Sequence, residues 1–171
     1  MTSTKATTSP AASASKGIDP RGPRFTAAVV AILFLVVIGL GLVGLTNPAA
    51  ATAALVLAIF NAAVFLWAAI RGVQNHPYGL FFKKVIRPRL APPVELEDPI
   101  PPTFAQGVGL FVTVLGIALF FVVGPIALVV AGAAAFVAAF LNSVFAYCLG
   151  CQIYLLLARA GVLGRKRPAA A

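Results

Sequence analysis

Residues 25–70 read FTAAVVAILFLVVIGLGLVGLTNPAAATAALVLAIFNAAVFLWAAI and contain no charged side chain. A helix needs about 20 apolar residues to cross the hydrocarbon core of a bilayer, so this block is long enough for two crossings. The triplet Thr46-Asn47-Pro48 divides it, because proline disfavours helix in the residue before it and the composition favours a turn. We therefore predict membrane spans at about 25–45 and 49–70.

A second charge-free block runs from Pro99 to Ala158, and Gly124-Pro125 divides it. It predicts spans at about 105–123 and 125–145, the last one continuing to 158. Residues 125–158 in one helix would measure about 50 Å, against a hydrocarbon core of about 30 Å. Either this helix extends beyond the bilayer, or it bends near Asn142-Ser143 and continues as an interfacial segment.

The composition agrees with a chain that lies mostly in lipid. It is 61% hydrophobic and 10% charged, whereas soluble domains are about 25% charged. A net charge of +9 on a soluble chain would indicate nucleic acid as a partner. Here the basic residues flank apolar spans and no nucleic-acid-reading motif accompanies them, so we expect membrane lipids and no nucleic acid as partners.

A secretory signal peptide is the competing interpretation of the first block, because Ala49-Ala50-Ala51 resembles a cleavage site. The apolar run before it is longer than the roughly 7–15 residues of a signal core. We therefore interpret residues 25–45 as a retained span.

Three charged stretches separate or flank the apolar blocks. Residues 1–24 carry a net charge of +3, residues 71–103 of +2 and residues 159–171 of +4, and the turns within each block carry none. By the positive-inside rule, all three stretches are cytoplasmic. We predict a membrane protein with four spans, a disordered cytoplasmic tail at 1–23, a cytoplasmic loop at 71–103 and a basic cytoplasmic tail at 159–171.

The loop contains one segment with helical periodicity. Its apolar residues follow a spacing of three and four, and its basic residues lie on the opposite face. The apolar face is Tyr78, Phe81, Phe82, Val85 and Ile86, and the basic face is Lys83, Lys84 and Arg87. The pattern predicts a short amphipathic helix, which either lies in the lipid headgroup region or packs on the ends of the spans.

The spans contain few polar residues and no ionisable carboxylate, Lys, Arg or His. Ion-coupled transport usually needs such groups within the membrane, so a small transporter is our third choice of function. Small residues recur every fourth position in the last block: Ala127, Ala131, Ala135, Ala139 and Ser143. This spacing favours close helix packing, either within the chain or with a second copy in a homo-oligomer.

Cys148 and Cys151 form the one motif with a chemical interpretation. On a helix, residues three apart share a face, so the two sulfurs can form a disulfide. A thiolate is favoured at a helix N-terminus, whereas apolar burial disfavours it, and two buried cysteines can also be inert. Gln152 stands where a c-type haem motif needs His, and two Cys with the distant His76 are too few for a zinc site. We predict no metal site and no cofactor.

Three strings together resemble the bacterial membrane family catalogued as domain of unknown function 4395. They are Arg87-Pro88-Arg89, the stretch from Pro101 to Gly109, and the stretch from Phe145 to Tyr154 that contains Cys-Leu-Gly-Cys-x-x-Tyr. The resemblance covers roughly residues 22–158 and implies a multi-pass protein of the bacterial inner (plasma) membrane. It implies a link to thioredoxin-like proteins or sulfurtransferases, with Cys148 and Cys151 as redox candidates and Tyr154, Arg87 and Arg89 as docking or orienting groups.

The architecture is also similar to small four-helix membrane oxidoreductases related to vitamin K epoxide reductase, which use a quinone. This chain differs because its cysteine pair is predicted on the cytoplasmic side and because it has no second pair to relay electrons. Quinone use is therefore not expected from the sequence.

Two functional hypotheses follow. In the first, the cysteine pair serves thiol redox or sulfur-relay chemistry with a cytoplasmic thioredoxin-like or sulfurtransferase partner. In the second, the protein is a non-enzymatic scaffold or complex subunit. Lys83, Lys84, Arg87, Arg89 and Tyr154 are the candidate partner or lipid contacts. The absence of a phosphate loop or catalytic triad argues against a stand-alone enzyme, although the sequence leaves that question open.

Overall fold

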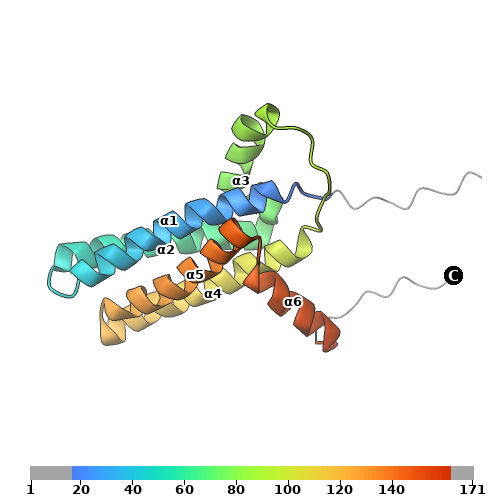
Figure 1. Ribbon diagram of the computed structural model, residues 1–171. Helices are drawn as coiled ribbons and strands as arrows, with labels where there is room; N and C mark the ends of the chain where they lie inside the picture. The colour runs from blue at the N-terminus through green and yellow to red at the C-terminus, as the bar shows by residue number, and fades with distance from the viewer. Residues whose placement is uncertain (1–16, 163–171) are drawn as a thin grey trace, which may run out of the picture.

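The computed structural model describes residues 17–162, and four of its helices are long and apolar enough to cross a membrane (Figure 1). These four helices are α1 (Arg21–Val43), α2 (Pro48–Arg71), α4 (Ile100–Val123) and α5 (Ile126–Phe145). The predicted all-α membrane architecture with four such helices is confirmed.

Two of these helices begin earlier than the sequence indicated. Helix α1 starts at Arg21 with Pro23 in its first turn, and α4 starts at Ile100 with Pro101 and Pro102 in its first turn. We had assigned these prolines to the tail and to the loop. Proline is tolerated in a first helical turn because the N–H groups there have no partner within the helix. The loop therefore ends at Pro99, and the N-terminal tail is shorter than predicted.

The turns between paired helices lie where proline and glycine indicated them. Asn47 caps α2 by accepting a hydrogen bond from Ala49 N–H at 3.0 Å, and Pro48 is the first helical residue. Gly124 joins α4 to α5 with a φ of +79°, a backbone conformation that residues with a Cβ rarely adopt. Both turns lie at the same end of the bundle (Figure 1).

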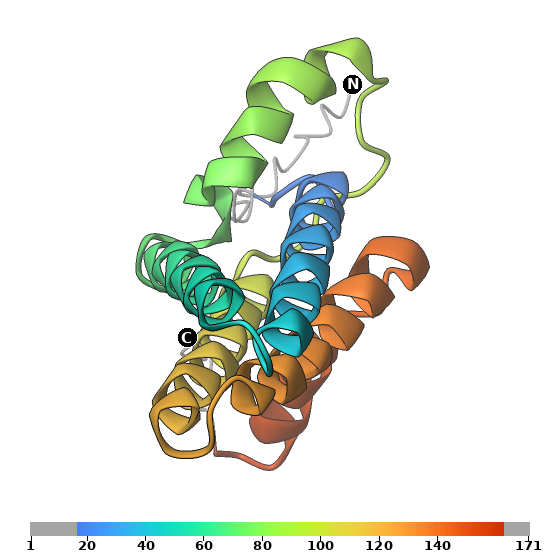
Figure 2. The ribbon, with the colours of Figure 1, turned by 90° about the vertical axis from the view of Figure 1, so that its left-hand side faces the viewer.

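The four helices form a closed antiparallel bundle in which α1 packs on α2 and α5, and α4 packs on the same two helices (Figure 2). Its core contains Phe34, Val37, Phe65 and Leu128, and the rings of Phe34 and Phe65 stack with centroids 6.1 Å apart. Large apolar side chains such as Ile32, Phe111 and Phe121 remain exposed on the outside. Exposed apolar side chains around the whole bundle are typical of a lipid-facing surface.

The alanine face of α5 packs within the chain. Gly116 of α4 lies directly against Ala131, with the carbonyl of Ala127 beside it. Ala127 and Ala135 are buried. The sequence left open which helix packs on this alanine face. At Ala127 and Ala131 that helix is α4, because the absence of a Cβ at Gly116 lets the two backbones approach closely.

The charged residues of the described chain gather at the end of the bundle opposite the two turns. Arg21 and Arg24 begin α1, Arg71 ends α2, and residues 72–99 connect α2 to α4 at the same end (Figure 1). Neither turn contains a charged residue. In each pair of helices, α1 with α2 and α4 with α5, the end that carries the turn therefore has no charged residue.

The predicted amphipathic segment is helical but varies in pitch. It consists of α3 (Pro77–Phe81), a π-helical turn η2 (Phe82–Ile86) and a 3₁₀ turn η3 (Arg87–Arg89), preceded by η1 (Val73–Asn75). Phe82 is buried against Phe25 of α1, with ring centroids 5.6 Å apart. Phe81 and Val85 are exposed. Part of the apolar face thus packs on the bundle end, and part remains available to lipid.

Residues 17–20 are held against the loop, so the structure corrects the prediction of a disordered tail as far as residue 23. Ile18 and Glu97 exchange two backbone hydrogen bonds of 2.9 Å. The Asp19 carboxylate accepts hydrogen bonds from Arg21 at 2.8 and 3.0 Å and lies 3.6 Å from Arg87 Nε. The predictions for residues 1–16 and 163–171 lie outside the described part of the chain.

The last apolar segment is two helices. Helix α5 ends at Phe145, residues 146–148 form a connection, and α6 (Leu149–Arg159) leaves the bundle at an angle (Figure 1). The bend lies just after Asn142-Ser143, where the sequence had indicated it. The segment is therefore bent and is not one overlong helix.

Candidate thiol–disulfide site

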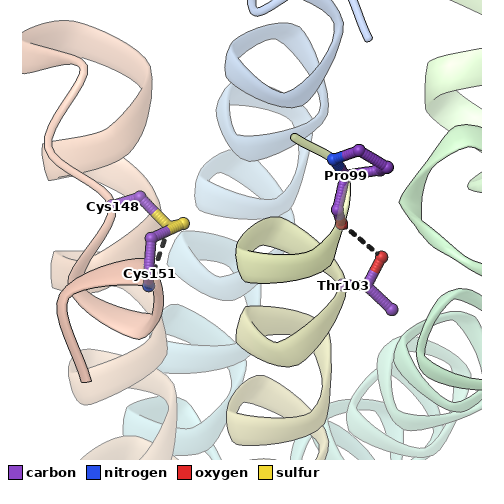
Figure 3. Close-up of a disulfide and its surroundings, with 4 residues drawn as sticks. All are labelled: Pro99, Thr103, Cys148 and Cys151. Atoms are coloured by element: carbon purple, nitrogen blue, oxygen red, sulfur yellow. Dashed lines mark hydrogen bonds between the residues drawn. A yellow bond between two sulfur atoms is a disulfide. The ribbon is translucent and has the colours of Figure 1, made fainter. Parts of the chain in front are cut away.

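Cys148 and Cys151 lie at the beginning of α6 and are joined by a disulfide (Figure 3). Cys148 is the N-cap residue, and its Sγ accepts a hydrogen bond from Cys151 N–H at 3.2 Å. The two Cα atoms are 5.2 Å apart, which is within the range for disulfides. Both residues are half-buried. The pair therefore occupies a helix N-terminus, where unpaired backbone N–H groups favour negative charge.

The connection before Cys148 sets this position. Ala146 adopts a left-handed conformation with a φ of 57°, and Tyr147 N–H donates to the Leu141 carbonyl at 3.1 Å. This arrangement ends α5 in the manner of a left-handed helix cap. Cys148 then has extended backbone angles, as an N-cap residue requires. A new helix therefore starts at the cysteine pair.

Gly150 brings the start of α6 against α4. A Cβ built on Gly150 would lie 2.7 Å from Ala105 Cα, so no larger residue fits without movement. Figure 3 shows the disulfide near the first turn of α4, which begins beside Pro99. In that turn, the Thr103 hydroxyl donates to the Pro99 carbonyl at 2.7 Å and accepts from Val73 N–H at 3.0 Å. The start of α6 is thus packed on α4 at Ala105, and the first turn of α4 is itself tied to Val73 through Thr103.

On its outer side, the disulfide borders a cleft of about 290 Å³, which we call the outer cleft. Both cysteines line it, and its charged lining residues are Arg24, Glu97 and Asp98. These come from the start of α1 and from the segment before α4. The outer cleft lies at the charged end of the bundle and presents both sulfur-bearing residues together with charges of both signs.

On its inner side, Cys148 also lines a second cavity of about 220 Å³, which we call the inner cavity. Its walls come from α1, α2, α4, α5 and the start of α6, and they are mostly apolar. Cys148 and Asn142 border both spaces. Cys148 therefore lies between a charged cleft at the end of the bundle and a partly open, mostly apolar cavity between the helices.

The predicted docking residues lie apart from the disulfide. Lys83 and Arg87 line a different cavity of about 590 Å³, on the side of α1 that faces η2, and none of the predicted basic residues lines the outer cleft. Tyr154 packs its ring on Phe104 of α4, with centroids 5.6 Å apart. Tyr154 therefore holds α6 on α4, and the basic residues form a separate surface.

Sequence reasoning missed the residues that surround the pair. Arg24, Glu97 and Gln106 come from three separate segments, and only folding brings them near Cys148. Gly150 lies between the two cysteines, but its contact with Ala105 also depends on the fold. Asn142 and Gln152 were the available signals, since both are polar residues in an apolar stretch. Asn142 had been interpreted only as a bend marker.

Asp19 and His76, which both lie outside the spans, have shifted pKa values. The hydrogen-bonded guanidinium of Arg21 holds the pKa of Asp19 below its usual value. Burial lowers the pKa of His76 to about 4. His76 is fully buried, its Nδ1 accepts from Tyr78 N–H at 3.3 Å, and its Nε2 has no partner. Within residues 17–162, no three His, Cys, Asp or Glu side chains are grouped to hold a metal ion.

The fold and the site define a multi-pass membrane protein of four apolar helices with a cysteine pair at the charged end. The chain belongs to the family described as domain of unknown function (DUF4395), whose model matches residues 18–159. No curated protein and no solved structure matches the chain.

Proposed function

We propose that this protein is a membrane component of thiol–disulfide exchange, with Cys148 and Cys151 as its redox pair. The observation that carries the proposal is the N-cap position of Cys148. Thiolates are stabilised at helix N-termini, where backbone N–H groups and the helix dipole favour negative charge. A sulfur in this position is both a good nucleophile and a good leaving group.

The proposed partner is a thioredoxin-like or sulfurtransferase protein on the cytoplasmic side. In the exchange, a partner thiolate attacks one sulfur of the disulfide and forms a mixed disulfide, while the other sulfur leaves as a thiolate. The second partner thiol then attacks the mixed disulfide. The partner is oxidised to its disulfide, and Cys148 and Cys151 are reduced to a dithiol.

The outer cleft is the proposed docking position for this partner, because both cysteines line it and Arg24, Glu97 and Asp98 can pair with partner charges. We place this end of the bundle on the cytoplasmic face of a bacterial plasma membrane, since the basic residues gather there. Lys83, Lys84, Arg87 and Arg89 would then meet anionic headgroups beside the docked partner.

The alternative function is a non-enzymatic scaffold or complex subunit. One observation that favoured it from the sequence was the alanine face of α5, which could have received a helix from another protein. Gly116 of α4 already packs against that face at Ala131. The scaffold hypothesis now depends on the exposed segment of η2 and η3. Within residues 17–162, its four basic side chains form one ion pair, that of Arg87 with Asp19.

Trapping of the mixed disulfide tests the proposal. In the Cys151→Ser variant, the Cys148 thiolate can attack the disulfide of an oxidised partner, which forms a mixed disulfide and releases one partner thiol. Cys151 is absent and cannot complete the exchange, so we expect a covalent complex that dithiothreitol releases. The matched Cys148→Ser variant should trap much less, because Cys151 is not at the N-cap. Covalent complexes separated from membranes and identified by mass spectrometry give the readout.

Two results would contradict the proposal. The first is the failure of both cysteines to react with a maleimide in membranes, with or without reductant. The second is capture of the same non-covalent partner by the wild type and by the Cys148→Ser/Cys151→Ser double variant, which would support the scaffold hypothesis.

A further inference from the structure

We propose that the inner cavity binds the head group of a lipid-soluble quinone, which reoxidises the Cys148–Cys151 dithiol. This inference rests on the proposed exchange function and names the acceptor for its electrons. The inner cavity has a volume of about 220 Å³, and Cys148 forms part of its wall. A quinone ring in the cavity would therefore lie next to the sulfur that exchanges with the partner.

The lining of the inner cavity suits an apolar ring. Most of its wall consists of alanine, glycine and valine residues together with Phe65. Ligand sites of this kind are mainly apolar, with a small number of polar groups that fix orientation. The cavity is partly open, with the exposed Ala134 in its wall, and the outer surface of the bundle is apolar. A carrier dissolved in the membrane can therefore reach it.

Gln106 supplies the polar contact. Its Oε1 atom is buried and has no hydrogen-bond partner among residues 17–162, and the residue lines the inner cavity. A buried acceptor without a partner costs about 1–3 kcal/mol, so a ligand that donates to it would be bound more tightly. A side-chain amide can donate to a quinone carbonyl and can accept from a quinol hydroxyl. The same side chain therefore matches both oxidation states of the carrier.

The two electrons that the Cys148–Cys151 pair receives from its partner must pass on to a further acceptor before the pair can react again. The chain contains only two cysteines, so the dithiol left by the partner has no second pair within the chain to reduce. The dithiol can instead transfer two electrons and two protons to the quinone, which re-forms the disulfide and produces quinol. The sum of the two steps converts partner dithiol and quinone into partner disulfide and quinol.

The position of Cys148 keeps the two reactions apart. Cys148 borders both the outer cleft and the inner cavity, so a soluble partner and a lipid-soluble carrier can approach from different sides. The comparison with relatives of vitamin K epoxide reductase argued against a quinone because the cysteine pair is predicted on the cytoplasmic side and because the chain has no second pair. A cytoplasmic position is no obstacle here, because the proposed partner is itself cytoplasmic. With a partner that reduces the site pair directly, no relay is needed.

The experiment uses the full chain, reduced and reconstituted in nanodiscs without oxygen. Decylubiquinone is the probe, because its ring is fully substituted and cannot form a thioether with a cysteine. Quinone absorbance and the number of free thiols are followed together. For the wild type we expect one quinone to be consumed for each pair of thiols lost.

Two cavity variants and one matched control locate the reaction. Ala138→Phe fills the inner cavity and Gln106→Leu removes its polar contact, whereas Val137→Phe places the same ring on the exposed face of α5. We expect the rate of quinone reduction to fall about tenfold or more in both cavity variants, as is common when a reactant is displaced. The control should keep the wild-type rate, and all variants should exchange with dithiothreitol normally. Gln106→Leu keeps the test decisive if Ala138→Phe does not fold.

Three results would overturn the inference. If the wild-type dithiol exchanges with thioredoxin but is not oxidised by decylubiquinone, the inner cavity holds a lipid chain or no ligand, and the proposed function stands alone. If folded Ala138→Phe and Gln106→Leu variants both react at the wild-type rate, the quinone reacts elsewhere. If the wild type reacts with neither thioredoxin nor quinone, the proposed function fails as well.

Discussion

At the scale of single residues, Cys148 combines a structural and a chemical role. Its sulfur accepts the Cys151 N–H that would otherwise be unpaired at the start of α6, and it is also half of the disulfide. Serine, threonine, aspartate or asparagine usually fills an N-cap position. The use of cysteine there means that the group that caps the helix is the group that reacts. Reduction leaves the cap in place, because a thiolate accepts the same hydrogen bond.

Gly150→Ala tests how closely α6 is held on α4. The added Cβ would lie 2.7 Å from Ala105 Cα, and neither backbone can give way without moving a helix. We expect a loss of stability of about 1–3 kcal/mol, the usual cost of overpacking, and faster labelling of the reduced cysteines. Thermal unfolding in detergent and maleimide labelling rates measure the two effects.

Gly107→Ala is the matched control for this substitution. It is also a helical glycine, and a Cβ at that position would meet nothing within 4 Å. Alanine has the higher helix propensity, so this variant should be neutral or slightly more stable. Equal stability of the two variants would show that the start of α6 is not packed against Ala105.

The cysteine pair was found from the sequence, but the function of the glycine between the cysteines was not. Spacing alone places Cys148 and Cys151 within reach of each other, because both belong to one short segment. Gly150 is explained only by Ala105, and the charges of the outer cleft come from α1 and from the segment before α4. Contacts between distant segments leave no periodic pattern in a single sequence.

Because His76 is buried in its neutral form, we predict that the protein loses stability in mild acid. Burial lowers its pKa from 6.5 to about 4, so the folded protein holds the neutral imidazole while the unfolded chain is protonated more easily. The stabilisation is complete above pH 6.5 and is lost as the pH falls from 6.5 toward 4. We expect the free energy of unfolding to decrease by roughly 2–3 kcal/mol between pH 7.5 and 4.5.

Trp67 reports on this change, because its Nε1 donates to the Asn75 carbonyl at 3.1 Å, next to His76, and it is the single tryptophan of the chain. Its fluorescence, recorded during thermal unfolding at each pH, gives the apparent melting temperature. The His76→Gln variant should be less stable at pH 7.5 but show a weaker dependence on pH. A wild-type protein whose melting temperature is constant over this range would contradict the assignment.

At the scale of elements, the connection between α5 and α6 is the feature that creates the site. The sequence indicated a bend near Asn142-Ser143, because both residues can compete with helical hydrogen bonds. The Ser143 hydroxyl instead donates to the Phe140 carbonyl at 3.0 Å, within the same helix, so α5 continues. The left-handed residue is Ala146, which has no turn-forming chemistry of its own. The residue types alone therefore did not predict that the cysteines lie at the start of a helix.

A second element, the segment before α4, is held by Asp19. Its carboxylate binds Arg21 and approaches Arg87, and Arg21 also donates to the Ala91 carbonyl at 3.0 Å. Asp19→Asn keeps the shape but removes the charge, and we expect a loss of about 1–3 kcal/mol at pH 7 because charge-assisted hydrogen bonds are broken. Hydrogen exchange in residues 86–98 should become faster.

Glu95→Gln is the control for Asp19→Asn. Glu95 lies in the same segment, is exposed and forms no ion pair with the described residues. Its neutralisation changes the net charge equally but should leave hydrogen exchange unchanged. Similar acceleration in both variants would mean that overall charge, and not the contact of Asp19 with Arg21, holds the segment.

At the scale of the whole molecule, the hydropathy and charge of the sequence were enough to predict the four long helices. The two apolar blocks and their turns predicted four long helices, because membrane-spanning segments must satisfy their backbone hydrogen bonds internally. The order of packing around the bundle, in which α1 meets α5 and α4 meets α2, could not be derived in the same way. It depends on small contacts such as Gly41 with Val129 and Gly132 with Phe34, which hydropathy does not encode.

The orientation of the molecule decides which compartment can supply the partner of the cysteine pair. The turn at Thr46 and the segment at Val94 lie at opposite ends of the bundle, and both residues are exposed, Val94 to 99%. In a Cys148→Ser/Cys151→Ser background, Thr46→Cys and Val94→Cys each provide a single thiol for a membrane-impermeant maleimide. Because the basic residues gather at the Val94 end, we expect Thr46→Cys to be labelled in intact spheroplasts and Val94→Cys only after permeabilisation. The reverse pattern would place the disulfide on the outer face of the membrane, and a partner in the cytoplasm could then not reach the outer cleft.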